Sequence, residues 1–211
     1  MEAEFISIHP KNPEGRKIQH VVDALQNGKL IIYPTDTVYG IGCDLFNRRA
    51  LERICDLKGL SARKMNLSFI CSSVSHISKF VKRIETSEFK VLKNHLPGPF
   101  TFIFESSREV PKIFGVNKKT VGIRIPNHKV PLHLVSLLGN PIVSTSVKQN
   151  ENDSVYPTEA SEIFNLYKNK VDLIIDSGIC GNTFSTVVDF TMGSPQVVRQ
   201  GLGQLGTAND I

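Results

Sequence analysis

Strand-like and helix-like segments alternate along nearly all of the 211 residues, and this alternation limits the fold more than any other feature. Short apolar runs that end at Pro, Gly or polar clusters are typical of buried strands, and apolar residues spaced three and four apart are typical of helices. Strands are expected at 5–8, 30–33, 67–71, 101–105, 120–125, 141–145, 172–176, 185–190 and 196–199. Helices are expected at 13–27, 47–59, 75–81, 87–95, 130–138 and 158–168.

This order predicts an α/β (mixed α+β) fold, with a single twisted sheet flanked by helices. Residues 192–195 read as a hairpin turn between the last two strands, so the sheet should be mixed, parallel and antiparallel. Asn12 and Pro13 resemble the start of the first helix, and Asn27-Gly28 resembles its end. We find no linker or repeat and expect one domain over residues 1–200, followed by a loosely held tail over 201–211.

The four cysteines are widely spaced, with no C-x-x-C pair and no histidine cluster beside them. This spacing argues against a zinc site and a disulfide framework, and reduced thiols indicate a cytoplasmic protein. No secretory leader is expected at the N-terminus, and no apolar run approaches the roughly 20 residues of a membrane span. The formal net charge is +5, with cations concentrated at 79–93 and 112–119. These stretches are either solvated surfaces or contacts for phosphate groups.

Polar side chains recur where apolar strands end, and they carry the functional prediction. The segment PTDTVYGIG follows the strand at 30–33, which is where open α/β sheets place ligand-binding loops. Gly40 and Gly42 would let the backbone approach a ligand closely. Arg124 lies in an apolar strand and needs an anionic partner, either an internal carboxylate or a ligand. Further hydroxyls and an arginine follow later strands at Ser144, Thr145, Ser146, Ser185 and Arg199.

Each of these segments also has a plain structural reading, as a turn or a helix cap. Together they predict one cleft for an anionic ligand. Gly201, Gly203 and Gly206 match the dinucleotide fingerprint G-x-G-x-x-G, but that loop needs a following helix and strand, for which the remaining residues leave no room. We therefore do not expect a nucleotide to bind there.

The segments resemble, in order, the motifs of the YrdC/YciO family of threonylcarbamoyl-AMP synthase-like proteins. The matching motifs are PTDTVYGIGCD from Pro34, the lysine of CDLKGL, PGPFTFI from Pro97, VGIRIP from Val121, PIVSTS from Pro141, STVVDF from Ser185 and VVRQG from Val197. The resemblance implies a YrdC/RibB-like fold with a concave, basic cleft. It also implies binding of ATP with Mg²⁺, of L-threonine and bicarbonate, and of double-stranded RNA or tRNA. The family reaction yields threonylcarbamoyl-adenylate for tRNA modification.

The resemblance assigns site residues by their positions in the motifs. It implies catalytic roles for Lys58 and Arg124. It implies nucleotide or substrate contacts for Thr35, Asp36, Thr37, Tyr39, Ser144, Ser146 and Arg199. We add Thr145 and Ser185 because their hydroxyls lie at strand ends, and Lys148 because it occupies a motif position with a different residue.

The chain departs from the synthase pattern at two positions, and the early IHPKNP segment resembles the YciO branch more. Leu60 replaces the arginine of the K-x-R motif, and Lys148 replaces the asparagine of S-T-S-A-N. Arg63 or Lys64 would be the candidates for a displaced cation. Three functions stay open: a divergent nucleotidyltransferase of the synthase type, a protein that hydrolyses or senses a nucleotide, and a non-catalytic RNA-binding module with a vestigial nucleotide cleft.

Overall fold

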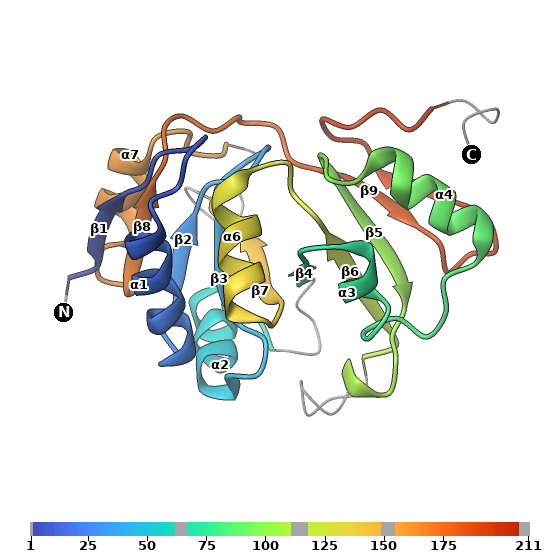
Figure 1. Cartoon of the computed structure of the whole chain (residues 1–211), viewed down its shortest axis with the longest axis horizontal. Helices are drawn as coiled ribbons and strands as arrows, with labels where there is room; N and C mark the ends of the chain where they lie inside the picture. The colour runs from blue at the N-terminus through green and yellow to red at the C-terminus, as the bar shows by residue number, and fades with distance from the viewer. Residues whose placement is uncertain (1, 62–66, 111–117, 149–154, 207–211) are drawn as a thin grey trace.

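The computed structural model describes residues 2–61, 67–110, 118–148 and 155–206. Within them, ten strands form one mixed sheet in the order β1-β8-β2-β3-β7-β4-β6-β5-β9-β10, and helices flank it (Figure 1). The strands are β1 (Glu4–Ser7), β2 (Ile31–Tyr33), β3 (Gly40–Asp44), β4 (Ser68–Ile70), β5 (Phe100–Glu105), β6 (Thr120–Arg124), β7 (Ile142–Ser146), β8 (Leu173–Asp176), β9 (Thr186–Asp189) and β10 (Gln196–Arg199). The helices are α1 (Gly15–Gln26), α2 (Arg48–Leu57), α3 (Val74–Ile77), α4 (Thr86–His95), α6 (Lys129–Leu138) and α7 (Ala160–Tyr167).

The predicted mixed sheet is confirmed. β1, β8 and β2 run parallel, as do β4 with β6 and β5 with β9, and the remaining neighbours pair antiparallel. β9 and β10 form the expected antiparallel hairpin. None of the helices in the described ranges is long and apolar enough to cross a bilayer.

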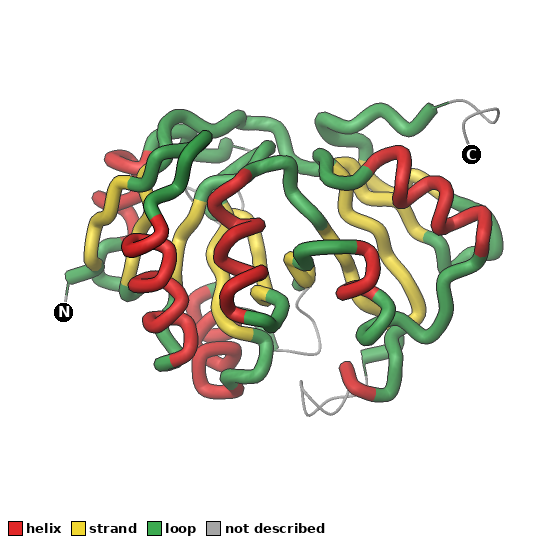
Figure 2. The backbone as a smooth tube through the Cα atoms, viewed as in Figure 1, coloured by secondary structure: helices red, strands yellow, loops and turns green. Residues whose placement is uncertain are grey.

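Apolar side chains cover both faces of the sheet, which explains why its central strands are continuous apolar runs. On β2, Ile31 and Tyr33 belong to a core beneath α1 and α6, whereas Ile32 belongs to the core on the other face, as does Leu30 just before the strand. α1 and α6 lie side by side over one face (Figures 1 and 2). This two-sided burial fixes the register of the strands whose ends form the site.

Helix starts follow the sequence signals in one case and depart from them in another. Asn47 caps α2 as expected, since its side chain accepts a hydrogen bond from the Ala50 backbone N–H. α1 begins two residues later than expected, with Glu14 as its N-cap instead of Asn12. Glu14 is held there by Lys17 and by the His9 backbone N–H, which also lower the pKa of its carboxyl to about 2.

The segment 40–44 forms β3, a strand that the sequence reading places in a loop. Pairing with β2 on one side and β7 on the other places β3 inside the sheet. A side chain at Gly42 would put Cβ 2.4 Å from Ile142 Cγ2 and 3.0 Å from a ring carbon of Tyr33. Glycine is therefore required here by close packing against neighbouring side chains.

The glycines of the 201–206 segment also have a packing role. A Cβ at Gly203 would lie 2.5 Å from the Phe100 ring. Thr186 Oγ1 accepts from the Gly201 backbone N–H at 2.9 Å and donates to the Gly203 carbonyl. Residues 201–203 are thus held against the start of β9. Residues 207–211 lie outside the described residues, and the domain boundary stays a prediction.

Gly42→Ala should lower the free energy of unfolding by about 1–3 kcal/mol, because the added methyl group overpacks the core between Tyr33 and Ile142. Chemical denaturation followed by circular dichroism measures this change. Gly15→Ala is the matched control, since nothing lies within 4 Å of a Cβ at that position. Equal stability of the two variants would contradict the packing role of Gly42.

Candidate functional site

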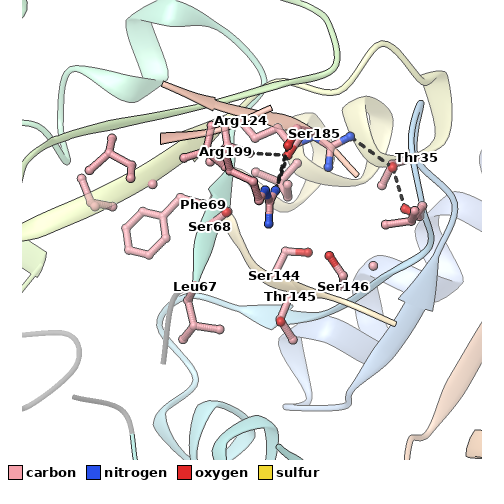
Figure 3. A pocket seen from close by; sticks show the side chains of 18 of the residues that line it. Thr35, Leu67, Ser68, Phe69, Arg124, Ser144, Thr145, Ser146, Ser185 and Arg199 are labelled. Atoms are coloured by element: carbon pink, nitrogen blue, oxygen red, sulfur yellow. Dashed lines mark hydrogen bonds between the residues drawn. The ribbon is translucent and has the colours of Figure 1, made fainter. Parts of the chain in front are cut away.

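A cavity of about 540 Å³ lies over the strand ends in the middle of the sheet. Its walls come from the β2–β3 loop, from the five strands β3, β4, β5, β6 and β7, and from the β9–β10 hairpin. Figure 3 shows hydroxyl groups and guanidinium groups along one part of the wall, and Leu67 and Phe69 along another. Its volume lies within the roughly 300–1,000 Å³ typical of small-molecule sites.

Arg124, at the end of β6, is buried and is held by the loop that follows β2. Its Nη2 donates to Thr35 Oγ1 at 3.2 Å, to Asp36 Oδ1 at 2.5 Å and to Thr37 Oγ1 at 2.7 Å. Each side chain of the Arg124–Asp36 ion pair is 10% exposed. Of the two readings left open by the sequence, the structure shows the internal carboxylate partner.

The loop is shaped by its own hydrogen bonds. Thr35 Oγ1 donates to the Val38 carbonyl at 2.7 Å and accepts the Thr37 backbone N–H at 3.1 Å. Because its single hydrogen is used on Val38, Thr35 acts toward Arg124 as an acceptor. Thr35 and Thr37 therefore orient Arg124, and ligand contact by Asp36 and Thr37, which do not border the cavity, stays a prediction.

A second polar group lies where β5, β9 and β10 meet. Arg199 Nη2 donates to the Ser185 carbonyl at 2.8 Å and to Ser185 Oγ at 3.3 Å. Ser185 Oγ in turn lies 2.9 Å from Thr101 Oγ1. The Arg199 guanidinium carbon lies 4.3 Å from the centre of the Phe184 ring, which supports it through a cation–π contact.

A third polar group is formed by β7 and the end of α2. Lys58 is buried as the C-cap of α2, and its Nζ donates to the Ser146 carbonyl at 3.0 Å. Ser144 accepts a hydrogen bond of 2.6 Å from the Tyr33 hydroxyl. Lys148 follows β7 on the cavity wall.

Gly40 and Gly42 have a packing role that the sequence does not suggest. A Cβ at Gly40 would lie 3.1 Å from Tyr33 Cζ and 3.0 Å from Ser144 Oγ. The two glycines therefore make room for the Tyr33 ring to cross β3 and reach β7. Gly40 does border the cavity, but close approach of a ligand to its backbone stays a prediction.

The described cavity wall holds five cationic side chains and no carboxylate; the cations are Lys58, Lys118, Arg124, Lys148 and Arg199. Partial burial lowers the pKa of Lys118. Partial burial and the nearby charge of Arg124 also lower the pKa of Arg199. An anion in the cavity would relieve both the desolvation and the repulsion between the two arginines.

The same donor set does not fit a resident Mg²⁺ ion. Protein-bound Mg²⁺ is usually held by one or two carboxylates together with substrate phosphates. The described wall offers hydroxyls and cations instead.

The structure brings most of the predicted site residues to one place. Ten of the twelve border the cavity, and Asp36 and Thr37 lie behind it. Arg63 and Lys64, the candidates for a displaced cation, lie outside the described residues. Lys118 and Thr101 also border the cavity, and Tyr33 contacts its wall through Ser144; none of the three was assigned to the site from the motifs. Lys118 belongs to the basic stretch 112–119 that the sequence offers as a possible phosphate contact, whereas Tyr33 gives no signal because it resembles an ordinary core residue.

Comparisons with known proteins agree on one family. The family profile Sua5_yciO_yrdC, described as "Telomere recombination", matches residues 23–201. An uncharacterised Haemophilus influenzae protein is 37% identical over 95% of this chain and 97% of its own. The crystal structure of Escherichia coli YciO superposes with a TM-score of 0.88 at 34% identity, covering 96% of this chain and 97% of that one.

A more distant relative has a named activity. The threonylcarbamoyl-AMP synthase of Pyrococcus abyssi is 31% identical over 88% of this chain. The crystal structure of P. abyssi Sua5 complexed with L-threonine superposes with a TM-score of 0.83 at 30% identity. This chain spans 57% of that structure and 54% of the synthase sequence.

Asp36→Asn should lower the free energy of unfolding by about 3 kcal/mol, because it leaves the buried Arg124 charge without its counter-ion. Denaturant titration at neutral pH measures the loss. Glu105→Gln is the control, since the Glu105–Lys82 pair is 58% and 69% exposed and should change stability by less than about 1 kcal/mol. Similar losses in the two variants would contradict an anchoring role for Asp36.

Proposed function

This chain belongs to the Sua5/YciO/YrdC family, and on that premise we propose that its cavity binds ATP and that the protein is a divergent homologue of threonylcarbamoyl-AMP synthase. The observation that carries the proposal is the cavity wall with five cations and, in its described part, no carboxylate. Such a wall suits a polyphosphate, since Arg and Lys are the preferred partners of phosphate oxygens.

The proposed reaction is attack of a carbamate on ATP. A carbamate oxygen forms a bond to the α-phosphorus, the bond between the α-phosphorus and the bridging oxygen breaks, and pyrophosphate leaves with the electron pair. The protein supplies positioning and charge neutralisation, and little covalent chemistry is needed. Arg124, Arg199 and Lys58 are the cations proposed for the phosphates. The proposed source of the carbamate is L-threonine, whose amine forms a bond to the carbon of bicarbonate as water leaves.

The two departures from the synthase motifs both lie at the cavity. Leu60 is 44% exposed on its wall, and Lys148 lies on the same wall after β7. Leu60 removes one positive charge relative to the motif and Lys148 adds one, so the number of cations is conserved while their positions change. We propose that the cavity still binds phosphate because the number of cations is conserved. We also propose that it holds the carbamate differently because the positions of the cations have changed.

Double-stranded RNA binding receives less support from the described residues. In the basic stretch 79–93, Lys82 pairs with Glu105 and Arg83 pairs with Glu85, both at 2.8 Å. Contacts from these two side chains to RNA phosphates would compete with the existing ion pairs. RNA binding is therefore kept as an alternative function that the tests below can favour.

ATP and pyrophosphate should each raise the melting temperature by about 5–10 °C when present at 100 times the dissociation constant, whereas adenosine should have little effect. The expected cause is neutralisation of the cations on the cavity wall. Thermal unfolding followed by intrinsic fluorescence measures the shift. Arg199→Gln should reduce it, and the exposed Lys29→Met variant is the matched control. Stabilisation by duplex RNA but by neither phosphate compound would favour the RNA-binding module.

Incubation with ATP, Mg²⁺, bicarbonate and L-threonine should yield threonylcarbamoyl-adenylate and pyrophosphate, detected by mass spectrometry. Lys58→Met should slow product formation by about 10²–10³-fold, because it removes a charge from the cavity while preserving the length of the side chain. A synthase with the complete K-x-R motif serves as the positive control. If this protein binds ATP but gives no product while the control does, ATP binding stands and synthesis of this adenylate is refuted.

A further inference from the structure

We infer that Tyr33 is a positioning residue that fixes Ser144 as a hydrogen-bond donor to a phosphate oxygen of the ligand. The inference rests on the proposed function, because it assigns one contact within the proposed nucleotide site. It starts from a buried hydrogen bond: the Tyr33 hydroxyl donates to Ser144 Oγ at 2.6 Å, from β2 across β3 to β7.

The direction of this hydrogen bond follows from the burial of Tyr33. The residue is 0% exposed, and Ser144 Oγ is the one acceptor that its hydroxyl reaches among the described residues. Burial also raises the pKa of the Tyr33 phenol, so it remains protonated. If Ser144 were the donor, the Tyr33 hydrogen would be buried without an acceptor, which is unfavourable. Tyr33 is therefore the donor.

The local sequence builds this contact specifically. Tyr33 pairs with Gly40 and Ser144 pairs with Gly42 in the register of the sheet. Both glycines lack the side chain that would fill the path of the Tyr33 ring, since a Cβ at either would meet that ring within about 3 Å. The G-I-G segment of β3 thus serves the contact between Tyr33 and Ser144.

The consequence for Ser144 concerns its one hydrogen atom. A serine hydroxyl that accepts from Tyr33 still has its own hydrogen to donate. No other side chain of the described residues takes that hydrogen, and Ser144 borders the cavity together with Arg124. Ser144 is thereby set to donate to an oxygen that carries lone pairs and no hydrogen. A phosphate oxygen meets this requirement, whereas an amine or amide N–H does not.

The test is a double-mutant cycle on ATP affinity, measured by isothermal titration calorimetry. Ser144→Ala removes the donor and should weaken ATP binding about tenfold, the value of a hydrogen bond to a charged group. Tyr33→Phe conserves the ring but frees the orientation of Ser144, and should weaken binding about threefold or more. The double variant should bind ATP like Ser144→Ala alone, because Tyr33 acts through Ser144.

Matched controls separate positioning from general destabilisation. Ser177 is a buried serine that donates to the Ile8 carbonyl at 2.7 Å and does not border the cavity, so Ser177→Ala should leave ATP affinity unchanged. Denaturant titration of every variant confirms that each is folded. A role of Tyr33 in packing alone would weaken binding equally in the wild-type and Ser144→Ala backgrounds.

The outcomes distinguish the inference from the proposed function. Wild-type protein that binds neither ATP nor pyrophosphate overturns both. Wild-type protein that binds ATP, together with an unchanged affinity in Tyr33→Phe or additive losses in the double variant, overturns the inference alone. A loss in Tyr33→Phe that disappears in the Ser144→Ala background supports it.

Discussion

The buried contact between Arg124 and the loop at 35–37 is the interaction on which the site depends. It joins the end of β6 to the loop between β2 and β3, which are not neighbours in the sheet. A guanidinium group cannot lose its hydration without such partners. The walls of the cavity are therefore held at a fixed separation by charge and by the threonine hydroxyls, in addition to the apolar packing that covers both faces of the sheet.

Hydroxyl groups surround this anchor, and their neighbours determine what each can do. Thr35 uses its hydrogen on a backbone carbonyl and acts as an acceptor for Arg124. Ser185 Oγ accepts a hydrogen bond from Arg199, because a guanidinium group can only donate. Similar side chains on one wall thus have different functions. Some hold the cations in place, and Ser144 is the one proposed to contact a ligand.

The sequence predicts the strand and helix order well because most elements are short apolar runs or amphipathic stretches with clear ends. The sequence does not predict β3, because Gly40 and Gly42 are typical of a loop. In the structure the Tyr33 ring occupies the space that their side chains would fill. Most of the residues predicted from the motifs border the cavity. The motifs could not show that Asp36 and Thr37 contact Arg124. These residues lie 88 and 87 positions from Arg124 in the sequence, and only the folded sheet brings them together.

The two arginines of the cavity are supported very unequally. Arg124 is buried within the sheet, whereas Arg199 lies on β10, the last strand in the sheet order, whose four residues are all exposed. Edge strands with few buried contacts open at a lower free energy than the centre of a sheet. Fraying of the hairpin would remove one cation from the cavity while the rest of the molecule stays folded. If the proposed ligand contacts Arg199, hydrogen exchange of this hairpin and occupancy of the cavity are thermodynamically linked.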